Sequence, residues 1–417
     1  MKARMLIFFL VIFVFCINKQ QGLAEDFDWP RWRGPNGDGI SMETEWDPKA
    51  LKEGPKILWK TKVGMGHSNI AIKGKYIYTM GYKGREKGDH VYCLNIDTGE
   101  EIWRYLYTGK MGTYGTQTTP TIDGKFLYTL SADGQIFCFK LKNGKLLWKK
   151  DLVNDLKSLE SNYGFATSPV VEGDLVILNA KTSGIALNKK TGDKIWEGEV
   201  NTDTEGNYFA TPVIYDHDDK RYVLIFSGSG LFSIDVETGG MVWFYEWTQT
   251  GAPNVADPVV FDKKVFLSHS EANACCVLLD ISGNEPSVLW ENENLRNHVS
   301  TSVYIDGYLY GIDGDYFSNI RKCSIRCIDS KSGAIMWKEE MRGASLIAVD
   351  GKLIILEDDG TLHIAEATPS SYQEISSCDV LDGEKNIRNF WTYPVLYKGK
   401  IYCRNLGGDL ICIDVSK

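Results

Sequence analysis

Seven tryptophans recur at a nearly constant spacing along this chain of 417 residues. The intervals are 44, 45, 48, 47, 47 and 47 residues, between Trp59, Trp103, Trp148, Trp196, Trp243, Trp290 and Trp337. A fixed period of about 20 to 50 residues is typical of repeat folds, in which each repeat is one supersecondary unit. The spacing therefore predicts a single repeat architecture, where length alone would favour two or three domains.

Five of these tryptophans end the same phrase. It reads CLNIDTGEEIW, CFKLKNGKLLW, ALNKKTGDKIW, SIDVETGGMVW and CIDSKSGAIMW, and in each case a glycine precedes the tryptophan by four residues. The alternating apolar residues predict a strand, and the Thr/Ser/Asn-Gly pair predicts a tight turn with positive φ at the glycine. The tryptophan then begins the returning strand.

A second signature precedes each phrase. Examples are TTPTIDGKFLYTL, TSPVVEGDLVILN, ADPVVFDKKVFLS and TYPVLYKGKIYCR, in which a proline and β-branched residues lead through a turn to an aromatic-rich strand. Each period therefore holds four short antiparallel strands, which is one propeller blade.

We predict an all-β, eight-bladed propeller of four-stranded antiparallel blades. The blades are expected to begin near His67, Thr118, Thr167, Ala210, Ala256, Ser300, Gly343 and Trp391. The chain ends at LICIDVSK without the turn and tryptophan, whereas KILWKTKV near the start has a tryptophan strand with no blade before it. The N-terminal strand is thus expected to complete the last blade and to remove the exposed sheet edges. Blade seven is degenerate, because EATPSSYQEISS lacks both glycine and tryptophan.

The segments outside the repeats predict export. Residues 1–24 combine Lys2 and Arg4 with an apolar run and end in Gly22-Leu23-Ala24, the layout of a secretory signal peptide whose apolar run is too short to span a bilayer. Cys16 is an alternative site of lipid attachment, although Phe15 stands where lipoprotein signals have a small residue. Residues 25–56 form a Trp/Pro/Gly-rich arm, and 57–417 form the propeller. The arm either packs Trp29 and Trp32 on the propeller or binds a partner.

The charge balance excludes some classes of partner. The whole chain has a formal net charge of −9, and residues 1–24 contain three basic and no acidic residues, so the charge after cleavage would be −12. Such an acidic chain is a poor partner for nucleic acid or an anionic membrane. No later segment is apolar enough to be a transmembrane helix. The six histidines have no metal-ligand spacing, and we predict no metal site and no catalytic residue.

Two adjacent cysteines, Cys275 and Cys276, raise the alternatives of packing, a redox site and a vicinal disulfide. We expect them on the third strand of blade five, with Val277 in the small-residue slot that holds Cys93 and Cys138 in other blades. A free cysteine in that slot behaves as a compact apolar side chain. The slots of different blades should be too far apart for disulfides, so packing is the favoured interpretation.

The loops that enter the innermost strands carry aromatic and amide side chains, which could bind a planar ligand, a sugar or a peptide at the mouth of the central channel. These candidate ligand-binding residues are Tyr114, Gln117, Asn162, Tyr163, Asn207, Tyr208, Asn254, Asp257, His298, Asn389 and Trp391. Asp257 stands out because the equivalent positions hold Thr119, Ser168 and Thr211. An acid there could bind a cation or act as a base. The alternative for the whole set is that it supports loop turns and caps the blades.

The phrase Ala/Cys-x-Asp/Asn-x-x-Thr-Gly-x-x-x-Trp resembles the tryptophan-docking repeat of pyrroloquinoline-quinone (PQQ) proteins, over nearly the whole chain after residue 24. One branch of that superfamily, the quinoprotein alcohol dehydrogenases, implies PQQ and calcium as cofactors. The other, the propeller lipoprotein of the outer-membrane β-barrel assembly machinery, implies a noncatalytic role. The segment DWPRWRGPNGDGIS resembles the arm of secreted PQQ-like repeat proteins.

The sequence favours a noncatalytic binding or assembly scaffold in the cell envelope. The expected location is the periplasm or the extracellular side, peripheral to the outer membrane, with an envelope protein or a glycan as partner and a monomeric propeller. The alternatives are a PQQ- and calcium-dependent oxidoreductase, with Asp257 as base or calcium ligand, and a glycan-binding propeller.

Overall fold

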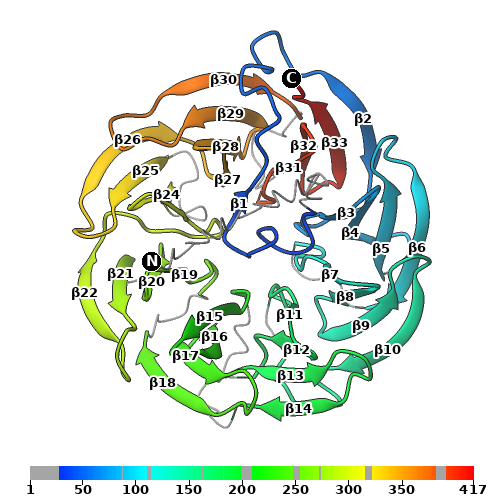
Figure 1. Cartoon of the computed structure of the whole chain (residues 1–417). Helices are drawn as coiled ribbons and strands as arrows, with labels where there is room; N and C mark the ends of the chain where they lie inside the picture. Colours follow the sequence, from blue (N-terminus) through cyan, green and yellow to red (C-terminus); the bar gives the residue numbers. More distant parts are fainter. Residues whose placement is uncertain are drawn as a thin grey trace, which may run out of the picture.

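The computed structural model describes residues 28–86, 88–109, 114–160, 163–181, 183–198, 209–247, 254–271, 274–314, 322–381 and 391–417. Figure 1 shows eight sheets arranged as a ring, in which residues 57–62, near the start of the chain, form a strand in the same sheet as the last strand, at 409–414. The all-β, eight-bladed propeller predicted from the tryptophan period is therefore confirmed. Among the residues described, no helix has the length and apolar character needed to cross a membrane.

The strands follow one another from the innermost to the outermost position of each blade. Blade 1 holds β3 (Ala71–Lys73), β4 (Tyr76–Lys83), β5 (Gly88–Asn95) and β6 (Glu101–Thr108); blade 2 holds β7 (Thr121–Asp123), β8 (Phe126–Leu130), β9 (Gln135–Lys140) and β10 (Lys145–Asp151); blade 3 holds β11 (Val170–Glu172), β12 (Leu175–Leu178), β13 (Ile185–Asn188) and β14 (Lys194–Glu197); blade 4 holds β15 (Val213–His217), β16 (Lys220–Ser227), β17 (Gly230–Asp235) and β18 (Met241–Glu246).

The second half of the ring has the same order. Blade 5 holds β19 (Val259–Phe261), β20 (Lys264–His269), β21 (Cys275–Asp280) and β22 (Ser287–Asn292); blade 6 holds β23 (Val303–Ile305), β24 (Tyr308–Asp313), β25 (Cys323–Asp329) and β26 (Ile335–Met341); blade 7 holds β27 (Ala344–Val349), β28 (Lys352–Glu357), β29 (Thr361–Glu366) and β30 (Glu374–Asp379), with β1 (Ile40–Ser41) added at its inner edge; blade 8 holds β31 (Val395–Tyr397), β32 (Lys400–Arg404), β33 (Asp409–Asp414) and β2 (Ile57–Lys62).

The ring closes between the two ends of the chain, as predicted. Strand β2 pairs antiparallel with β33, in a register that places Trp59 opposite Cys412. Because β2 is the outermost strand of blade 8, the edge of β33 is paired rather than open to solvent.

Five of the repeated tryptophans donate a hydrogen bond to the next blade. Trp59 of blade 8 donates its indole N–H to the carbonyl of Ile96 in blade 1, and its ring lies against the turn glycine Gly99. Gly99 has φ of +70°, and a Cβ atom there would lie 2.5 Å from the Trp59 ring. The same indole-to-carbonyl bond recurs in the pairs Trp148–Lys189, Trp196–Val236, Trp290–Ser330 and Trp337–Thr368. The Gly-x-x-x-Trp phrase thus encodes both sides of a contact between neighbouring blades.

Blade 7 has no docking tryptophan, and the arm supplies a replacement. Ser376 of β30 takes the place in the register that a tryptophan has in other blades, opposite Ile364. The Ser376 hydroxyl donates to Pro48 O (2.6 Å), and the Asp47 N–H donates to Val415 O (2.7 Å), a carbonyl directly after β33. Trp46 is almost fully buried in the core cluster at this seam. The arm therefore makes the bond to blade 8 that blade 7 cannot make.

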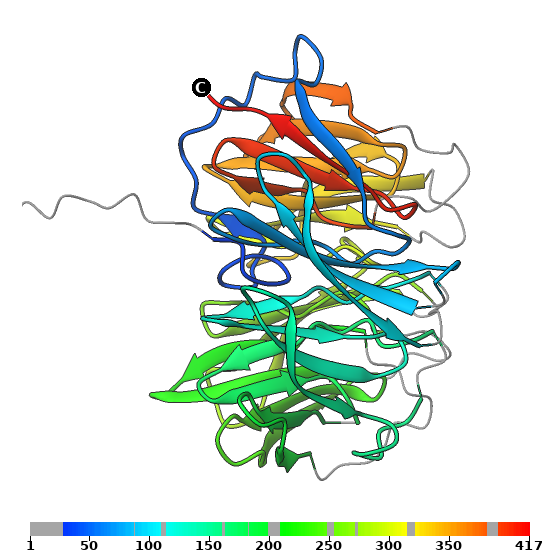
Figure 2. The same ribbon diagram turned by 90° about the vertical axis from the view of Figure 1, so that its right-hand side faces the viewer.

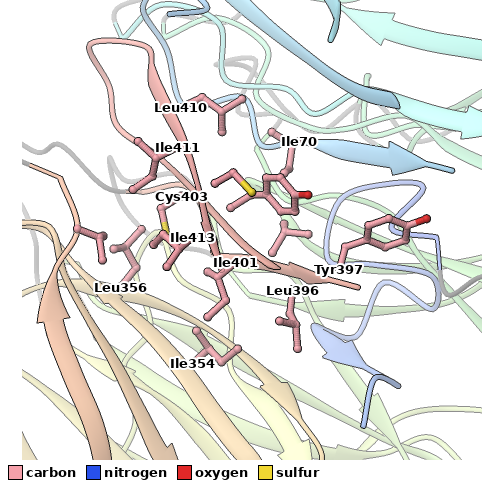
Figure 3. Packing of buried hydrophobic residues seen from close by; sticks show 14 of the residues in the cluster. Ile70, Ile354, Leu356, Leu396, Tyr397, Ile401, Cys403, Leu410, Ile411 and Ile413 are labelled. Atoms are coloured by element: carbon pink, nitrogen blue, oxygen red, sulfur yellow. The ribbon is translucent and has the colours of Figure 1, made fainter. Parts of the chain in front are cut away.

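The packing at this seam is apolar. Figure 3 shows Ile354 and Leu356 of β28 lying beside Ile401 of β32 and Ile413 of β33. These side chains are fully buried, so the two blades share one continuous core.

The arm also crosses the axis of the ring (Figures 1 and 2). Strand β1 pairs in parallel with the end of β27, and Trp29 forms a β-bridge with Ile72 in the middle of β3. The Ile122 N–H of β7 donates to Pro30 O. The arm therefore covers the end of the ring at which the innermost strands finish. The predicted packing of Trp29 is present, since that ring is 2% exposed.

The cysteine pair lies at the start of β21, the predicted strand, but the predicted slot is wrong by one residue. Leu278, not Val277, pairs with Trp290 and takes the position of Cys93 and Cys138. The turn between β21 and β22 is longer than in the blades that carry the Gly-x-x-x-Trp phrase. Counting six residues back from Gly283 therefore gives a position one residue too early. The Cys275 and Cys276 thiols are not disulfide-bonded in the structure, and burial raises their pKa values to about 11 and about 12.

Candidate channel-mouth site

A belt of hydrogen bonds links the innermost strands around the axis. In each step the backbone N–H of one blade donates to a side chain at the equivalent position of the next blade: Asn69 to Thr119, Thr119 to Ser168, Ser168 to Thr211, Thr211 to Asp257 and Asp257 to Thr301. The Thr301 N–H then reaches the hydroxyl of Tyr393 in blade 8. Short polar side chains recur at these positions because each must accept one N–H from its neighbour.

Asp257 has a role in this belt that threonine or serine cannot fill. One carboxylate oxygen accepts the Thr211 N–H (2.7 Å), and the other accepts the indole N–H of Trp32 in the arm (2.7 Å). Burial raises the pKa of Asp257, while the nearby Arg33 charge and these hydrogen bonds oppose the shift. The acid thus fastens the arm to the inside of the ring.

An aromatic cluster lies at the opposite end of the axis, in loops that lead into innermost strands. The His67 and Trp391 rings stack with centroids 4.5 Å apart, and Tyr114 contacts the Trp391 ring edge at 5.2 Å. Burial, together with the charge of Arg404, lowers the pKa of His67 to about 3. The imidazole is therefore neutral at physiological pH.

Arg404 fixes the loop that carries His67. This fully buried side chain donates to the carbonyls of Ser68 and Gly64 and to the Thr79 hydroxyl. Burial lowers its pKa to about 9. Arg404 comes from β32 and its acceptors lie in and before blade 1, so it bridges the seam where the ring closes.

The other predicted site residues are more scattered. Gln117 donates its amide N–H to Tyr163 O (3.1 Å), which places these two beside each other. Asn254 is buried and donates to Ser227 O (2.8 Å), and His298 lies 2.9 Å from the Glu271 carboxylate. Asn162, Asn207, Tyr208 and Asn389 lie outside the described residues. The structure thus brings together Tyr114 with Trp391, and Gln117 with Tyr163.

His67, Arg404 and Trp32 were not among the predicted site residues. His67 marked only the start of a blade in the sequence, and Arg404 followed an ordinary strand pattern. Arg404 meets the loop of His67 only where the ring closes, which joins parts of the chain more than 300 residues apart. Trp32 meets Asp257 across 225 residues of sequence.

A family profile described as "Outer membrane protein assembly factor BamB" matches residues 87–339. The chain belongs to this BamB family. The BamB protein of Yersinia pestis is 23% identical over 330 residues, a match that covers 74% of this chain and 77% of the relative.

Solved structures show the same fold. The BamB structure from Moraxella catarrhalis has a TM-score of 0.64 and 14% identity, over 86% of this chain and 99% of that one. A europium-containing methanol dehydrogenase has a TM-score of 0.70 and 13% identity, over 94% and 98%. The propeller is therefore common to BamB proteins and quinoprotein dehydrogenases.

The described residues of this BamB-family chain do not fit a metal-assisted quinone site at Asp257. Both of its oxygens already accept hydrogen bonds, one of them from the arm. Within the described part of the chain, no group of three or more His, Cys, Asp or Glu side chains is arranged to hold a metal ion. A hard cation such as calcium requires several oxygen ligands, which Asp257 alone does not supply.

Proposed function

We propose that this protein is a noncatalytic binding or assembly scaffold of the cell envelope. The observation that carries the proposal is the BamB-family match over 87–339, which spans most of blades 1 to 6. Named relatives in this family are outer membrane protein assembly factors. The proposed location is the periplasmic side of the outer membrane, after removal of residues 1–24.

The structure supports a scaffold role in physical terms. The ring is a rigid platform. Its outer edge strand is paired at the closure, and buried tryptophans join neighbouring blades. Asp257, the acid most suited to chemistry in the sequence, holds the arm instead. The acidic net charge of the chain favours protein surfaces over nucleic acid as partners.

We place the partner surface at the channel-mouth end of the ring. Tyr163 is 46% exposed and lies beside Gln117, and the partly exposed Tyr114 packs on the buried Trp391 at the same end. Partly exposed aromatic side chains are the residues that most often anchor protein partners. A glycan could use the same stacking faces, and a glycan array tests that alternative.

Photo-cross-linking in the native envelope tests the proposal. A photoreactive amino acid at Tyr163 should give a reproducible adduct with an envelope protein. The matched control position is Ile195, which is 51% exposed on the outer strand β14 and should give a different or no adduct. If neither position yields a reproducible adduct, the scaffold proposal fails.

A second experiment separates the scaffold from an oxidoreductase. Purified protein mixed with PQQ and calcium should show neither a bound-quinone absorbance nor dye-linked alcohol oxidation. Appearance of both signals would replace the scaffold by the dehydrogenase alternative.

A further inference from the structure

The residue directly after each repeated tryptophan is charged in six of the seven periods. These residues are Lys60, Arg104, Lys149, Glu197, Glu291 and Lys338. In blade 4 the same position holds Phe244, whose side chain is 36% exposed on β18. Charged side chains on an outer strand hinder its pairing with another chain. Blade 4 therefore lacks a protection that the other six periods have.

The whole of β18 is apolar for a strand on the outer rim of the ring (Figure 1). Its sequence is MVWFYE, and Met241, Val242 and Phe244 are 52%, 41% and 36% exposed. The outer strands β2, β6, β10, β14 and β26 also expose apolar side chains, but each carries at least one lysine or arginine. A short window of β-favouring apolar residues without proline is typical of strands that pair with other chains.

The backbone of β18 is placed to receive a further strand. It is the last strand of its sheet and pairs antiparallel with β17, from Gly230 opposite Glu246 to Ile234 opposite Met241. In the part of the chain that the structure describes, no strand pairs with the other side of β18. A row of backbone N–H and C=O groups at a sheet edge is a template for an extended segment. The occupant that fits this edge is therefore a strand.

The surroundings of β18 are acidic. Residues 222–262 contain no lysine or arginine, but they include Glu237 in the turn before β18 and Glu246 at its end. Burial raises the pKa of the Tyr245 hydroxyl on β18, and the nearby charge of Glu291 on β22 raises it further. A carboxylate of the neighbouring blade thus also lies close to this strand. Charge complementarity favours a partner segment that carries lysine or arginine.

We propose that the outer edge of β18 binds an extended segment of a partner protein that combines apolar residues with lysine or arginine. The backbone of the segment pairs with β18, its apolar side chains cover Met241 and Phe244, and its basic side chains lie near Glu237 and Glu246. A second copy of this chain fits less well, because the whole chain is acidic, with a formal net charge of −9. The inference does not depend on the proposed channel-mouth surface, which lies elsewhere on the ring.

Binding of dye-labelled peptides to the full chain tests the proposal, with fluorescence anisotropy as the readout. The probes are Lys-Val-Thr-Val-Thr-Val-Lys, the same peptide with glutamate in place of both lysines, and the lysine peptide with N-methyl groups on all its internal residues. The lysine peptide should bind about ten-fold or more tightly than the glutamate peptide, because like charges repel. N-methylation should also weaken binding by about ten-fold or more, because it removes the backbone donors. Equal binding of the lysine peptide and either of the other two, or no binding of any probe, overturns the proposal.

Variants assign the binding to β18. Phe244→Lys introduces the kind of charge that the other periods have at this position and should weaken the lysine peptide by about ten-fold. Met241→Lys reproduces Lys194 of β14, which also stands two residues before its tryptophan, and should act in the same direction. Because Met241 is 52% exposed, this second variant keeps the test valid if Phe244→Lys does not fold. The matched control is Met336→Lys on β26, at a side chain that is 43% exposed, and it should bind the peptide as the native chain does. If Met336→Lys weakens binding as much as Met241→Lys, the site is not β18.

Light scattering of the native chain distinguishes a protein partner from a second copy. The chain should be monomeric at the concentrations of the peptide titrations. A dimer that Met241→Lys converts into a monomer would show that β18 pairs with another copy, and it would overturn the assignment to a basic partner segment.

Discussion

At the scale of single residues, the docking tryptophans and their glycines explain why the period is so regular. In five of the seven, the indole donates to a carbonyl of the next blade, and several of the rings lie against a turn glycine of that blade. Large side chains that bury much apolar area dominate the energetics of such seams. The two positions therefore recur together, whereas residues between them vary freely.

Trp196→Ala should destabilise the protein strongly. The indole is 6% exposed, donates to Val236 O (2.8 Å) and lies against Gly239 of blade 4. Truncating a buried tryptophan typically costs about 3–5 kcal/mol of unfolding free energy. Urea unfolding measures the loss. The adjacent Ile195→Ala is the control, since Ile195 is 51% exposed and its loss should cost less than about 1 kcal/mol. Equal losses for the two variants would contradict the docking role.

His363 on β29 should make stability depend on pH. Its Nδ1 lies 2.6 Å from the Glu374 carboxylate and its Nε2 lies 2.8 Å from the Glu357 carboxylate. Burial alone would lower the pKa of His363, but the two carboxylates outweigh it, and the pKa is raised. Only the imidazolium can donate from both nitrogens at once.

The sign of the effect follows from that raised pKa. A histidine whose pKa is higher in the folded than in the unfolded chain contributes stability that is complete below the unfolded value of about 6.5, and that stability is lost as the pH rises through the folded value. The difference in unfolding free energy between the native protein and His363→Gln should therefore shrink as the pH rises above about 6.5. Denaturant unfolding at several pH values measures it. A difference that grows with pH would show that the two carboxylates do not hold the imidazolium.

At the scale of elements, the regular blades could be predicted from the sequence. The contacts that compensate for irregular blades could not. Turn glycines and alternating apolar residues recur in the regular periods, so the strands of blades 1 to 4 could be predicted. The seam between blades 7 and 8 depends on Trp46 and Asp47, which stand outside the period and more than 300 residues before their partners. Likewise, Leu278 replaced Val277 in the slot because blade 5 has a longer turn.

In the candidate site, too, some features could be predicted from the sequence and others could not. The loops that carry Tyr114, Gln117, Tyr163 and Trp391 were predictable because they precede innermost strands in every blade. The bond between Trp32 and Asp257 was not, because 225 residues separate the two and no repeat relates them. Contacts between distant segments depend on how the whole ring is assembled. The local sequence pattern therefore does not predict them.

Trp46→Ala tests whether the arm stabilises the seam between blades 7 and 8. The ring is 1% exposed at the seam, so its removal should leave a cavity and cost about 3–5 kcal/mol of unfolding free energy. Thermal or urea unfolding measures the change. The control is Met42→Ala in the same arm, because Met42 is 56% exposed and should matter little. If the two variants are equally stable, the arm does not support the seam.

At the scale of the whole molecule, the ring is a closed sheet system whose last blade is completed by the first repeat strand. The Lys56 Nζ atom lies 2.6 Å from Asp414 Oδ2, and the Asp414 N–H donates to Lys56 O. The two chain segments therefore meet side by side at the closure. Closure of this kind removes the edge at which another chain could pair. A chain without β2 would expose β33 as a long apolar edge strand.

Truncation and permutation test the closure directly. A chain of residues 63–417 should self-associate and unfold at a lower temperature than the full chain, because β33 loses its partner. Appending residues 56–62 after Ser416 through a Thr-Gly turn should restore a monomer, since the register places Ile57 opposite Ile413 and a tight turn can join them. The permuted chain should still be less stable than the full chain, because it lacks Trp46. Light scattering after size-exclusion chromatography and thermal unfolding give both readouts. A truncated chain that remains monomeric with unchanged unfolding would show that the ring does not need its N-terminal strand.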